Sequence, residues 1–343
     1  MSIDEEFPKV LKRLAGGETL GAETATRAFA AIMAGEVSEA RMAAFLTALA
    51  IRKPTVAELA GAAQAMRAAM RAVSAPAGAV DLCGTGGDGL GTLNISTATA
   101  FVVAGAGVPV AKHGNRNISS KSGAADVLEA LGVKIGLEPA ASERCLKEAN
   151  LCFMFAPTHH TAMKFVAPVR KDLGFRTVFN LLGPVCNPAK VRRQLLGVYD
   201  EEWLEPIANV LAMLGSERAW VVHGSDGLDE LTSTGPTQAA ILENGKVVKK
   251  TIVPEDAGLE RALVSDLIGG DAPHNAEAIR ALLGGAKDPF RDVVLLNAAA
   301  ALVIAGKAAG LKPGVKLAAD AIDSGKAKDV LSRLIAVSQA ANE

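Results

Sequence analysis

A glycine-rich stretch, Gly84-Thr85-Gly86-Gly87-Asp88, follows a short apolar run of strand type. Glycines leave backbone N–H groups uncovered, so a phosphate can approach closely and bind several donors at once. By pattern, Gly84, Gly86 and Gly89 also fit the dinucleotide motif G-x-G-x-x-G, which needs an acidic residue about 20 positions further on for the ribose. No Asp or Glu occurs from Gly89 to Ala125, and no P-loop motif occurs here. The stretch predicts a phosphate loop of another kind, with a plain tight turn as the alternative.

The segment without carboxylates carries hydroxyls, amides and cations at three places. They are Asn94-Ile95-Ser96-Thr97, Lys112-His113-Gly114-Asn115-Arg116 and Ser119-Ser120-Lys121. Hydroxyl and amide groups at possible helix starts, together with cations, form an anion site. Beside the glycine-rich stretch, the ligand that this chemistry predicts is a polyanion such as pyrophosphate.

Two adjacent carboxylates, Asp229 and Glu230, follow an apolar run that ends at His223. Carboxylates at the C-terminal end of a strand suit a hard cation, which binds one or two of them and bridges to substrate phosphates. A solvated acidic turn is the alternative. Because a pyrophosphate site needs Mg²⁺, we expect the pair to bind this ion.

Three cations, Arg170, Lys171 and Arg176, lie on an otherwise apolar passage from a helix to a loop. Arg170 could pair bidentately with a substrate carboxylate, or it could be a surface or capping arginine. The pair His159-His160 could act in acid–base chemistry or bind a metal. Adjacent positions do not face one another on a helix, which argues against a shared metal.

The chain that positions these residues has 343 residues, is 50% hydrophobic and carries a formal net charge of −1. This length indicates two unequal domains or one large α/β body. The lack of a basic surplus argues against nucleic-acid binding. The acidic N-terminus is unlike a signal peptide, the apolar stretches are shorter than a membrane span, and the four cysteines lack paired or metal-ligand spacing. We expect a cytoplasmic protein with reduced, interior cysteines.

The predicted fold class is α/β, with a small all-helical N-terminal domain and a larger α/β domain. Residues 1–73 show apolar residues at helical spacing and a capping box at Thr55 and Glu58. A helical segment near residues 160–180 is expected to pack on this domain. Residues 74–343 alternate short apolar runs with helical segments, which indicates a mostly parallel sheet covered on both faces. The predicted strands are Ala79–Cys83, Val108–Ala111, Leu151–Phe155, Leu195–Tyr199, Ala219–His223, Ala239–Leu242 and Val247–Ile252. Asn244-Gly245, between the last two, predicts an antiparallel hairpin.

A series of motifs along the chain resembles the anthranilate phosphoribosyltransferase family. They are Gly-Thr-Gly-Gly-Asp (84–88), Asn-x-Ser-Thr (94–97), Lys-His-Gly-Asn-Arg-x-x-Ser-Ser (112–120), Gly-x-Ala-Asp (123–126), Phe-Ala-Pro-x-x-His (155–160), Arg-Thr-x-Phe-Asn-x-Leu-Gly-Pro (176–184), Gly-Val-Tyr (197–199) and His-Gly-x-Asp-Gly-Leu-Asp-Glu (223–230). The resemblance runs from about residue 5 to residue 340 without large insertions. Two positions depart from the family pattern: Thr161 stands where Pro is usual, and Ala124 where Ser is common.

The resemblance implies transfer of the phosphoribosyl group from PRPP to the amine of anthranilate in tryptophan biosynthesis, by a homodimer with two Mg²⁺ ions per subunit. It also implies the fold of pyrimidine nucleoside phosphorylases. The implied PRPP residues are Gly84, Gly87, Asp88, Thr92, Asn94, Ile95, Ser96, Thr97, Lys112, His113, Gly114, Asn115, Arg116, Asn117, Ile118, Ser119, Ser120 and Ala124. The implied anthranilate residues are Gly84, Asn115, His160 and Arg170, and the implied Mg²⁺ ligands are Ser96, Asp229 and Glu230. Lys112 and Arg170 are expected to act electrostatically, without a general base.

Two other functions remain open at this point. A pyrimidine nucleoside phosphorylase of the same fold would carry a Lys-x-Ser-x-Arg signature near its base pocket, and none is found. A non-catalytic, nucleic-acid-binding relative would rely on a basic surface, which a net charge of −1 does not supply. Turnover of thymidine with phosphate would support the first alternative, and salt-dependent binding of single strands would support the second.

Overall fold

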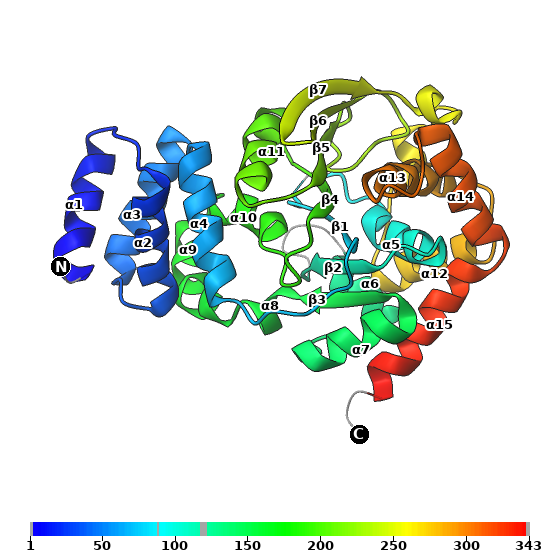
Figure 1. Ribbon diagram of the computed structural model, residues 1–343, viewed down its shortest axis with the longest axis horizontal. Coiled ribbons are helices and arrows are strands. Elements are labelled where there is room, and N and C mark those ends of the chain that lie inside the picture. The colour runs from blue at the N-terminus through cyan, green and yellow to red at the C-terminus, as the bar shows by residue number, and fades with distance from the viewer. Residues whose placement is uncertain (1–2, 88, 117–121, 341–343) are drawn as a thin grey trace.

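The computed structural model describes residues 3–87, 89–116 and 122–340 of the chain. They form a helical domain and a larger α/β domain (Figure 1). The helical domain begins with α1 (Ile3–Ala15), α2 (Ala22–Ala34), α3 (Glu39–Arg52) and α4 (Val56–Ala69). On α1, Phe7, Val10 and Leu14 recur at helical spacing and are all buried, so the periodicity marks the face that packs on the other helices.

Later parts of the chain complete the helical domain. The helices α9 (Ala167–Leu173) and α10 (Phe179–Val185) pack on α3 and α4, respectively. The ring of Phe29 lies 5.2 Å from that of Phe45 and 5.8 Å from that of Phe179, measured between centroids, in edge-on contacts. One apolar core therefore joins the first helices to residues that follow much later in the sequence.

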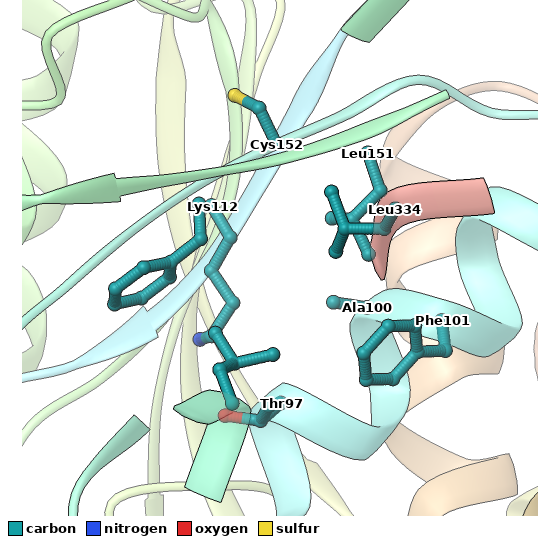
Figure 2. A pocket seen from close by; sticks show the side chains of 9 residues that line it. Thr97, Ala100, Phe101, Lys112, Leu151, Cys152 and Leu334 are labelled. Carbon is teal, nitrogen blue, oxygen red and sulfur yellow. The ribbon is translucent and has the colours of Figure 1, made fainter. Parts of the chain in front are cut away.

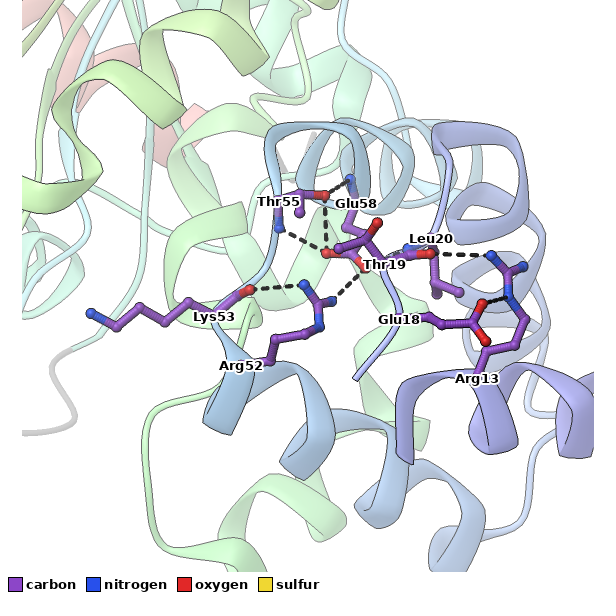
Figure 3. Close-up of polar contacts among 8 residues, drawn as sticks. All are labelled: Arg13, Glu18, Thr19, Leu20, Arg52, Lys53, Thr55 and Glu58. Atoms are coloured by element: carbon purple, nitrogen blue, oxygen red, sulfur yellow. Dashed lines mark hydrogen bonds and ion pairs between the residues drawn. The ribbon is translucent and has the colours of Figure 1, made fainter. Parts of the chain in front are cut away.

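The carboxylate of Glu58 links three segments of the helical domain (Figure 3). Glu58 and Thr55 form the predicted capping box at the start of α4. The same carboxylate accepts hydrogen bonds from the Leu20 N–H at 2.8 Å and from the Arg52 guanidinium at 2.5 Å. Burial raises the pKa of Glu58, but the hydrogen bonds from Arg52, Thr55 and Leu20 outweigh it, so the pKa lies below its ordinary value. The charged form of Glu58 is the one that holds these segments together.

A seven-stranded sheet forms the centre of the α/β domain, in the order β3-β2-β1-β4-β5-β6-β7. The strands are β1 (Val80–Gly84), β2 (Val110–Gly114), β3 (Leu151–Phe155), β4 (Arg193–Gly197), β5 (Arg218–Gly224), β6 (Thr237–Glu243) and β7 (Lys246–Ile252). The first five are parallel, and β6 and β7 add an antiparallel hairpin. Asn244 and Gly245 both have positive φ, as the hairpin turn requires. The predicted mostly parallel sheet and its hairpin are confirmed.

Three strands, β2, β4 and β6, differ by two or three residues from their predicted bounds. β2 starts only after Pro109, which has no N–H to donate to a neighbouring strand. β4 ends at Gly197, although Val198 remains buried and Tyr199 half-buried. The N–H of Val198 still donates to Val222 of β5 at 2.9 Å, so both burial and one hydrogen bond continue past the assigned end of β4. An apolar run alone does not mark where a strand ends.

Helices cover both faces of the sheet (Figure 1). Leu195 and Leu196, neighbours on β4, belong to opposite cores, as the two-residue repeat of a strand requires. The remaining helices are α5 (Ile95–Gly105), α6 (Ala124–Ala130), α7 (Pro139–Ala149), α8 (Ala156–His159), α11 (Leu204–Met213), α12 (Ala272–Leu283), α13 (Pro289–Ile304), α14 (Leu311–Asp323) and α15 (Lys326–Gln339). Within the described ranges, none of the helices has the length and apolarity needed to cross a membrane. All four cysteines are buried and free, as expected.

Candidate active site

Several of the predicted site residues that the structure describes lie at the C-terminal ends of β1 and β2. The glycine-rich stretch begins at Gly84, the last residue of β1, and Lys112, His113 and Gly114 form the end of β2. β1 pairs with β2 on one side and with β4 on the other, so the strand order reverses at β1. In open α/β sheets, ligands bind beyond the carboxyl ends of the strands at such a reversal. The topology therefore places the phosphate loop where a ligand is expected.

Asp229 lies against the glycine-rich stretch. Its Oδ2 accepts a hydrogen bond of 2.7 Å from the N–H of Gly86. A Cβ on Gly84 would lie only 2.2 Å from this oxygen, and a Cβ on Gly197 would lie 1.5 Å from the carbonyl oxygen of Asp229. Gly84 and Gly197 are paired residues at the ends of β1 and β4. Two glycines thus make room for the acidic segment, and the role of Gly197 was missed by the sequence analysis.

The second carboxylate of the pair, Glu230, also lies close to β1. Burial raises the pKa of Cys83 on β1 well above its ordinary value, and the negative charges of Asp81 and Glu230 add to this effect. Asp229 and Glu230 are both 9% exposed. The two carboxylates therefore lie at the end of β1, in a recess rather than on an open turn.

The oxygen atoms of Asp229, Glu230 and Ser96 are hard donors of the type that Mg²⁺ prefers. In the part of the chain that the structure describes, no cluster of three or more His, Cys, Asp or Glu side chains could hold a metal ion alone. A site with two carboxylates fits an ion that completes its coordination with substrate phosphates and water. The residues present are compatible with Mg²⁺ bound together with a phosphorylated substrate.

Lys112 directs its ammonium group from β2 toward the start of α5. Its Nζ donates to the carbonyl oxygen of Leu82 on β1 and, at 3.2 Å, to the hydroxyl of Ser96. The side chain is 3% exposed, and it lines a cavity of about 10 Å³ that Thr97 and Phe101 of α5 also line (Figure 2). A cavity of this size holds one water molecule at most. It is packing space behind Lys112 and not the substrate site.

The first turn of α5 is open to an anion. It has no acidic residue, and the side chain of its N-cap residue Asn94 does not cap the helix. The carboxamide of Asn94 instead donates to the Ser122 carbonyl at 3.2 Å and accepts from Asn275 at 2.9 Å. The first intrahelical bond runs from Ala98 to Asn94, so the N–H groups of Ser96 and Thr97 precede the regular bonds. These donors, next to Lys112, are groups of the kind that an anion site needs.

Two predicted PRPP residues near this turn serve the local backbone. Thr92 forms an antiparallel bridge with Ile268, next to the short helix η4 (Val264–Leu267). Ile95 is buried, and its N–H donates to Leu93 at 2.8 Å. Both residues hold the connection between the glycine-rich stretch and α5 in place.

After β2, the structure describes Gly114, Asn115 and Arg116 of the predicted PRPP segment. The guanidinium of Arg116 donates to Asp126 at 2.9 Å and to Glu129 at 2.8 Å, which are both on α6. The charge of Arg116 is thus paired within the fold. Its partners lie just after the segment without carboxylates, which ends at Ala125. Asn115 accepts at its carbonyl from Ala125, next to the predicted contact Ala124 at the start of α6. The predicted contacts Asp88, Asn117, Ile118, Ser119 and Ser120 lie outside the described residues.

Arg176 covers the glycine-rich stretch, a role that the sequence analysis did not assign. Its Nη2 donates to the carbonyl of Gly87 at 2.5 Å, and its guanidinium carbon lies 4.0 Å from the centroid of the Tyr199 ring. The N–H of Tyr199 in turn donates to the Thr85 hydroxyl at 3.0 Å. Arg176 and Gly87 are 89 residues apart, and no local spacing signal could have paired them.

Two neutral histidines, one of them on β2, lie next to each other. The rings of His113 and His160 are 5.1 Å apart between centroids, and His113 Nδ1 is 3.1 Å from the Gly183 carbonyl of α10. Burial lowers the pKa of His113 well below its ordinary value and, with the charge of His159, lowers the pKa of His160 to about 4. His159 turns instead to the Arg71 carbonyl, at 2.9 Å from its Nδ1. The adjacent histidines thus face different partners, which agrees with the argument against a shared metal.

Arg170 on α9 also contacts α10. Its Nη2 donates to Asn180 at 3.4 Å, and its guanidinium lies 5.8 Å from the centroid of the Phe179 ring. Burial lowers the pKa of Arg170, although a guanidinium remains charged in proteins. The structure therefore joins Arg170 and the His113–His160 pair through α10, whereas the hydrogen bonds of Asn115 involve neither group. A half-buried cation in an apolar setting suits a ligand carboxylate.

Models of two families match the chain. The helical bundle domain of a glycosyl transferase family matches residues 8–70, and the a/b domain of a glycosyl transferase family matches residues 76–328. Among curated relatives, the anthranilate phosphoribosyltransferase of Rhodopseudomonas palustris (strain BisB18) is 57% identical, over 98% of this chain and 99% of its own length. That of Parvibaculum lavamentivorans is 56% identical over the same shares.

Solved structures give the same result. The anthranilate phosphoribosyltransferase of Thermus thermophilus superposes with a TM-score of 0.91 and 44% identity, covering 96% of this chain and 99% of that one. The enzyme of Saccharomyces cerevisiae in complex with PRPP and Mg superposes with a TM-score of 0.90 and 28% identity, covering 99% of both chains.

Proposed function

Because the chain belongs to the anthranilate phosphoribosyltransferase family, we propose that it binds PRPP with Mg²⁺ at the end of β1 and anthranilate beside α10. The enzyme transfers the phosphoribosyl group to the amine of anthranilate, which gives N-(5-phosphoribosyl)anthranilate and pyrophosphate in tryptophan biosynthesis. One observation carries the site assignment: the hydrogen bond between Asp229 and Gly86 brings the acidic pair onto the phosphate loop.

In this proposal the diphosphate of PRPP binds to backbone donors and to one buried cation. The N–H groups of Ser96 and Thr97 at the start of α5 and the ammonium of Lys112 are already oriented by the fold. Donors that are fixed before the reaction stabilise developing negative charge without reorganising at that moment. When bound, Mg²⁺ neutralises charge on the departing pyrophosphate. Asp229, Glu230 and Ser96 hold the metal, with a proposed stoichiometry of two ions per subunit.

Arg170 pairs with the carboxylate of anthranilate, and Asn115 and His160 contribute to the same pocket. The amine of anthranilate is an aniline and is neutral at pH 7, so it needs no strong general base. The neutral state of His160, whose pKa burial lowers to about 4, agrees with a contact role and not with an acid role. Catalysis then rests on positioning and electrostatics.

The reaction is a displacement at the anomeric carbon with inversion, through an oxocarbenium-like transition state. The two substrates approach from different elements: PRPP from β1 and α5, and anthranilate from α9 and α10. Closure of the helical domain (residues 1–73 with the segment near residues 160–180) onto the α/β domain (residues 74–343) would bring them together and exclude water. We further propose that the protein is a cytoplasmic homodimer. Analytical ultracentrifugation would measure the mass of the assembly.

The decisive experiment follows the fluorescence of anthranilate after mixing with the enzyme, PRPP and Mg²⁺. The signal should fall only when all components are present, and omission of PRPP or chelation of Mg²⁺ should abolish the fall. Unchanged fluorescence together with turnover of thymidine and phosphate would instead support a nucleoside phosphorylase. For the site assignment, Glu230→Gln should raise the Mg²⁺ concentration needed for half-maximal rate.

A further inference from the structure

Asn297 contacts the acidic segment from behind. It is fully buried on α13 and belongs to none of the sequence motifs of the proposed site. Its Oδ1 accepts from the N–H of Leu231 at 3.0 Å, and its Nδ2 donates to the carbonyl of Leu231 at 2.8 Å and to that of Val293 at 2.9 Å. Leu231 directly follows Glu230. One side chain therefore binds both backbone polar groups of the residue next to the proposed Mg²⁺ ligands.

These two bonds fix the orientation of the backbone at the acidic pair. The N–H of Leu231 belongs to the peptide unit that starts at Glu230, so its bond to Asn297 sets the plane in which the Glu230 backbone lies. Residues 225–236 contain no helix or strand. Backbone bonds satisfy some of their N–H and C=O groups, such as the bond from Ser225 to Pro236, and side chains must pair with the other buried ones. Leaving such a group unpaired costs about 1–3 kcal/mol. A carboxamide suits this position because it carries a donor and an acceptor on one rigid fork.

The rest of this loop is held mainly from within, with two further bonds to neighbouring segments: the N–H of Thr232 donates to the Thr237 hydroxyl of β6, and the N–H of Ala262 donates to the Ser233 carbonyl, both at 3.0 Å. Asp226 accepts hydrogen bonds from the Leu228 N–H at 3.1 Å and from the hydroxyls of Thr232 and Thr234 at 2.6 and 2.7 Å. These bonds shape the loop but do not place it on the domain. Asn297 connects the loop to a helix of the core, and Asp229 connects it to the glycine-rich stretch.

We propose that Asn297 is a positioning residue of the Mg²⁺ site: it holds Asp229 and Glu230 at the end of β1 through the backbone of Leu231. This inference rests on the proposed role of the two carboxylates as metal ligands. Asn297 itself touches neither substrate nor metal, so its effect is on how tightly the ion and its diphosphate bind, and not on recognition of anthranilate.

The test is calorimetric titration of PRPP into the enzyme at a series of fixed free Mg²⁺ concentrations. Loss of a residue that orients metal ligands commonly weakens metal binding by about tenfold or more. Asn297→Ala should therefore need about tenfold more Mg²⁺ for half of the maximal PRPP affinity. The KM for anthranilate at saturating Mg²⁺ should stay the same. If this variant does not fold, Asn297→Ser leaves a hydroxyl near the Val293 carbonyl and is measured instead.

Two control variants separate positioning from general destabilisation. Leu302→Ala opens a cavity at a fully buried position of the same helix without removing a polar side chain. Asn209→Ala removes an exposed asparagine that makes the same type of bond, to the carbonyl four residues earlier at 2.8 Å. Both should keep the Mg²⁺ dependence of the parent enzyme.

The outcomes distinguish the inference from the assignment on which it rests. If Asn297→Ala and Leu302→Ala show the same Mg²⁺ dependence while Glu230→Gln shifts it, the carboxylates bind the metal but Asn297 does not position them. If Glu230→Gln also leaves the dependence unchanged, the metal-site assignment itself is wrong.

Discussion

The guanidinium of Arg176 lies over the ring of Tyr199 at 4.0 Å while it donates to the carbonyl of Gly87. Arg176 belongs to the segment between α9 and α10, which pack on the helical domain. Gly87 belongs to the glycine-rich stretch of the α/β domain. The contact therefore ties the loop that is proposed to bind PRPP to the segment that is proposed to bind anthranilate.

Arg176→Ala should weaken PRPP binding. The variant loses a hydrogen bond and a cation–π contact that together contribute about 1–2 kcal/mol, which is roughly fivefold to thirtyfold in the KM for PRPP. Arg176→Lys should have a KM for PRPP between those of the parent and of Arg176→Ala, because an ammonium keeps the charge but loses the planar stacking on Tyr199. Steady-state kinetics measures the effect. An unchanged KM for PRPP would show that the hydrogen bond from Arg176 to Gly87 does not contribute to PRPP binding.

Arg170→Ala should raise the KM for anthranilate. A charge-assisted contact contributes about 1.5–3 kcal/mol, or roughly tenfold to a hundredfold in KM. Lys171→Ala, at the neighbouring exposed position, is the matched control and should have little effect. If the two variants behave alike, Arg170 is a structural arginine that pairs with Asn180 and Phe179 only.

Gly197→Ala should displace the acidic segment. Its new Cβ would overlap the carbonyl oxygen of Asp229, and overpacking of this kind costs about 1–3 kcal/mol. We expect a lower free energy of unfolding in urea and a higher Mg²⁺ requirement for PRPP binding. Gly310→Ala has no atom within 4 Å of its new Cβ and is the control. If Gly197→Ala kept the stability and the Mg²⁺ requirement of the parent, the segment around Asp229 would be able to shift without a loss of free energy.

The stability of the helical domain should depend on pH through Glu58. Its pKa in the folded protein lies below the ordinary value of 4.5, so its contribution is fully present above pH 4.5 and is lost as the pH falls through the folded pKa. Glu58→Gln should therefore be less stable than the parent at pH 7, with a smaller further loss on acidification. Urea unfolding at pH 7 and below pH 4 measures this, and Glu23→Gln, on an exposed ion pair, is the control. If the free energy of unfolding changed equally with pH in the parent and in Glu58→Gln, Glu58 would not be the source of the pH dependence.

The fold was largely predictable because its signals are local. The capping box at Thr55 and Glu58 and the turn at Asn244-Gly245 each depend on neighbouring residues only, and both occur where predicted. The predicted strand ends were less accurate, because Val198 is buried and Tyr199 half-buried although the assigned strand β4 ends at Gly197.

The site was predictable in its chemistry but not in its contacts. Asp229 and Gly86 are 143 residues apart, and only the assembled sheet brings them together. For Arg116, the local sequence suggested an unpaired cation. It belongs to a segment free of carboxylates, yet α6 folds back and supplies Asp126 and Glu129 as partners. Asn297 lies within an apolar run, and an asparagine there carries no signal until its partner Leu231 is known.

The shared core of α1–α4 with α9 and α10 has a consequence for synthesis of the chain on the ribosome. Phe29 and Phe45 emerge early, but the ring that completes their cluster, Phe179, is translated only after three strands of the sheet. Until then the nascent helices present an apolar face to solvent, where chaperones and proteases can act on it. The first domain to be translated is thus among the last to finish its interior, and a chain that stalls before residue 160 would leave it incomplete.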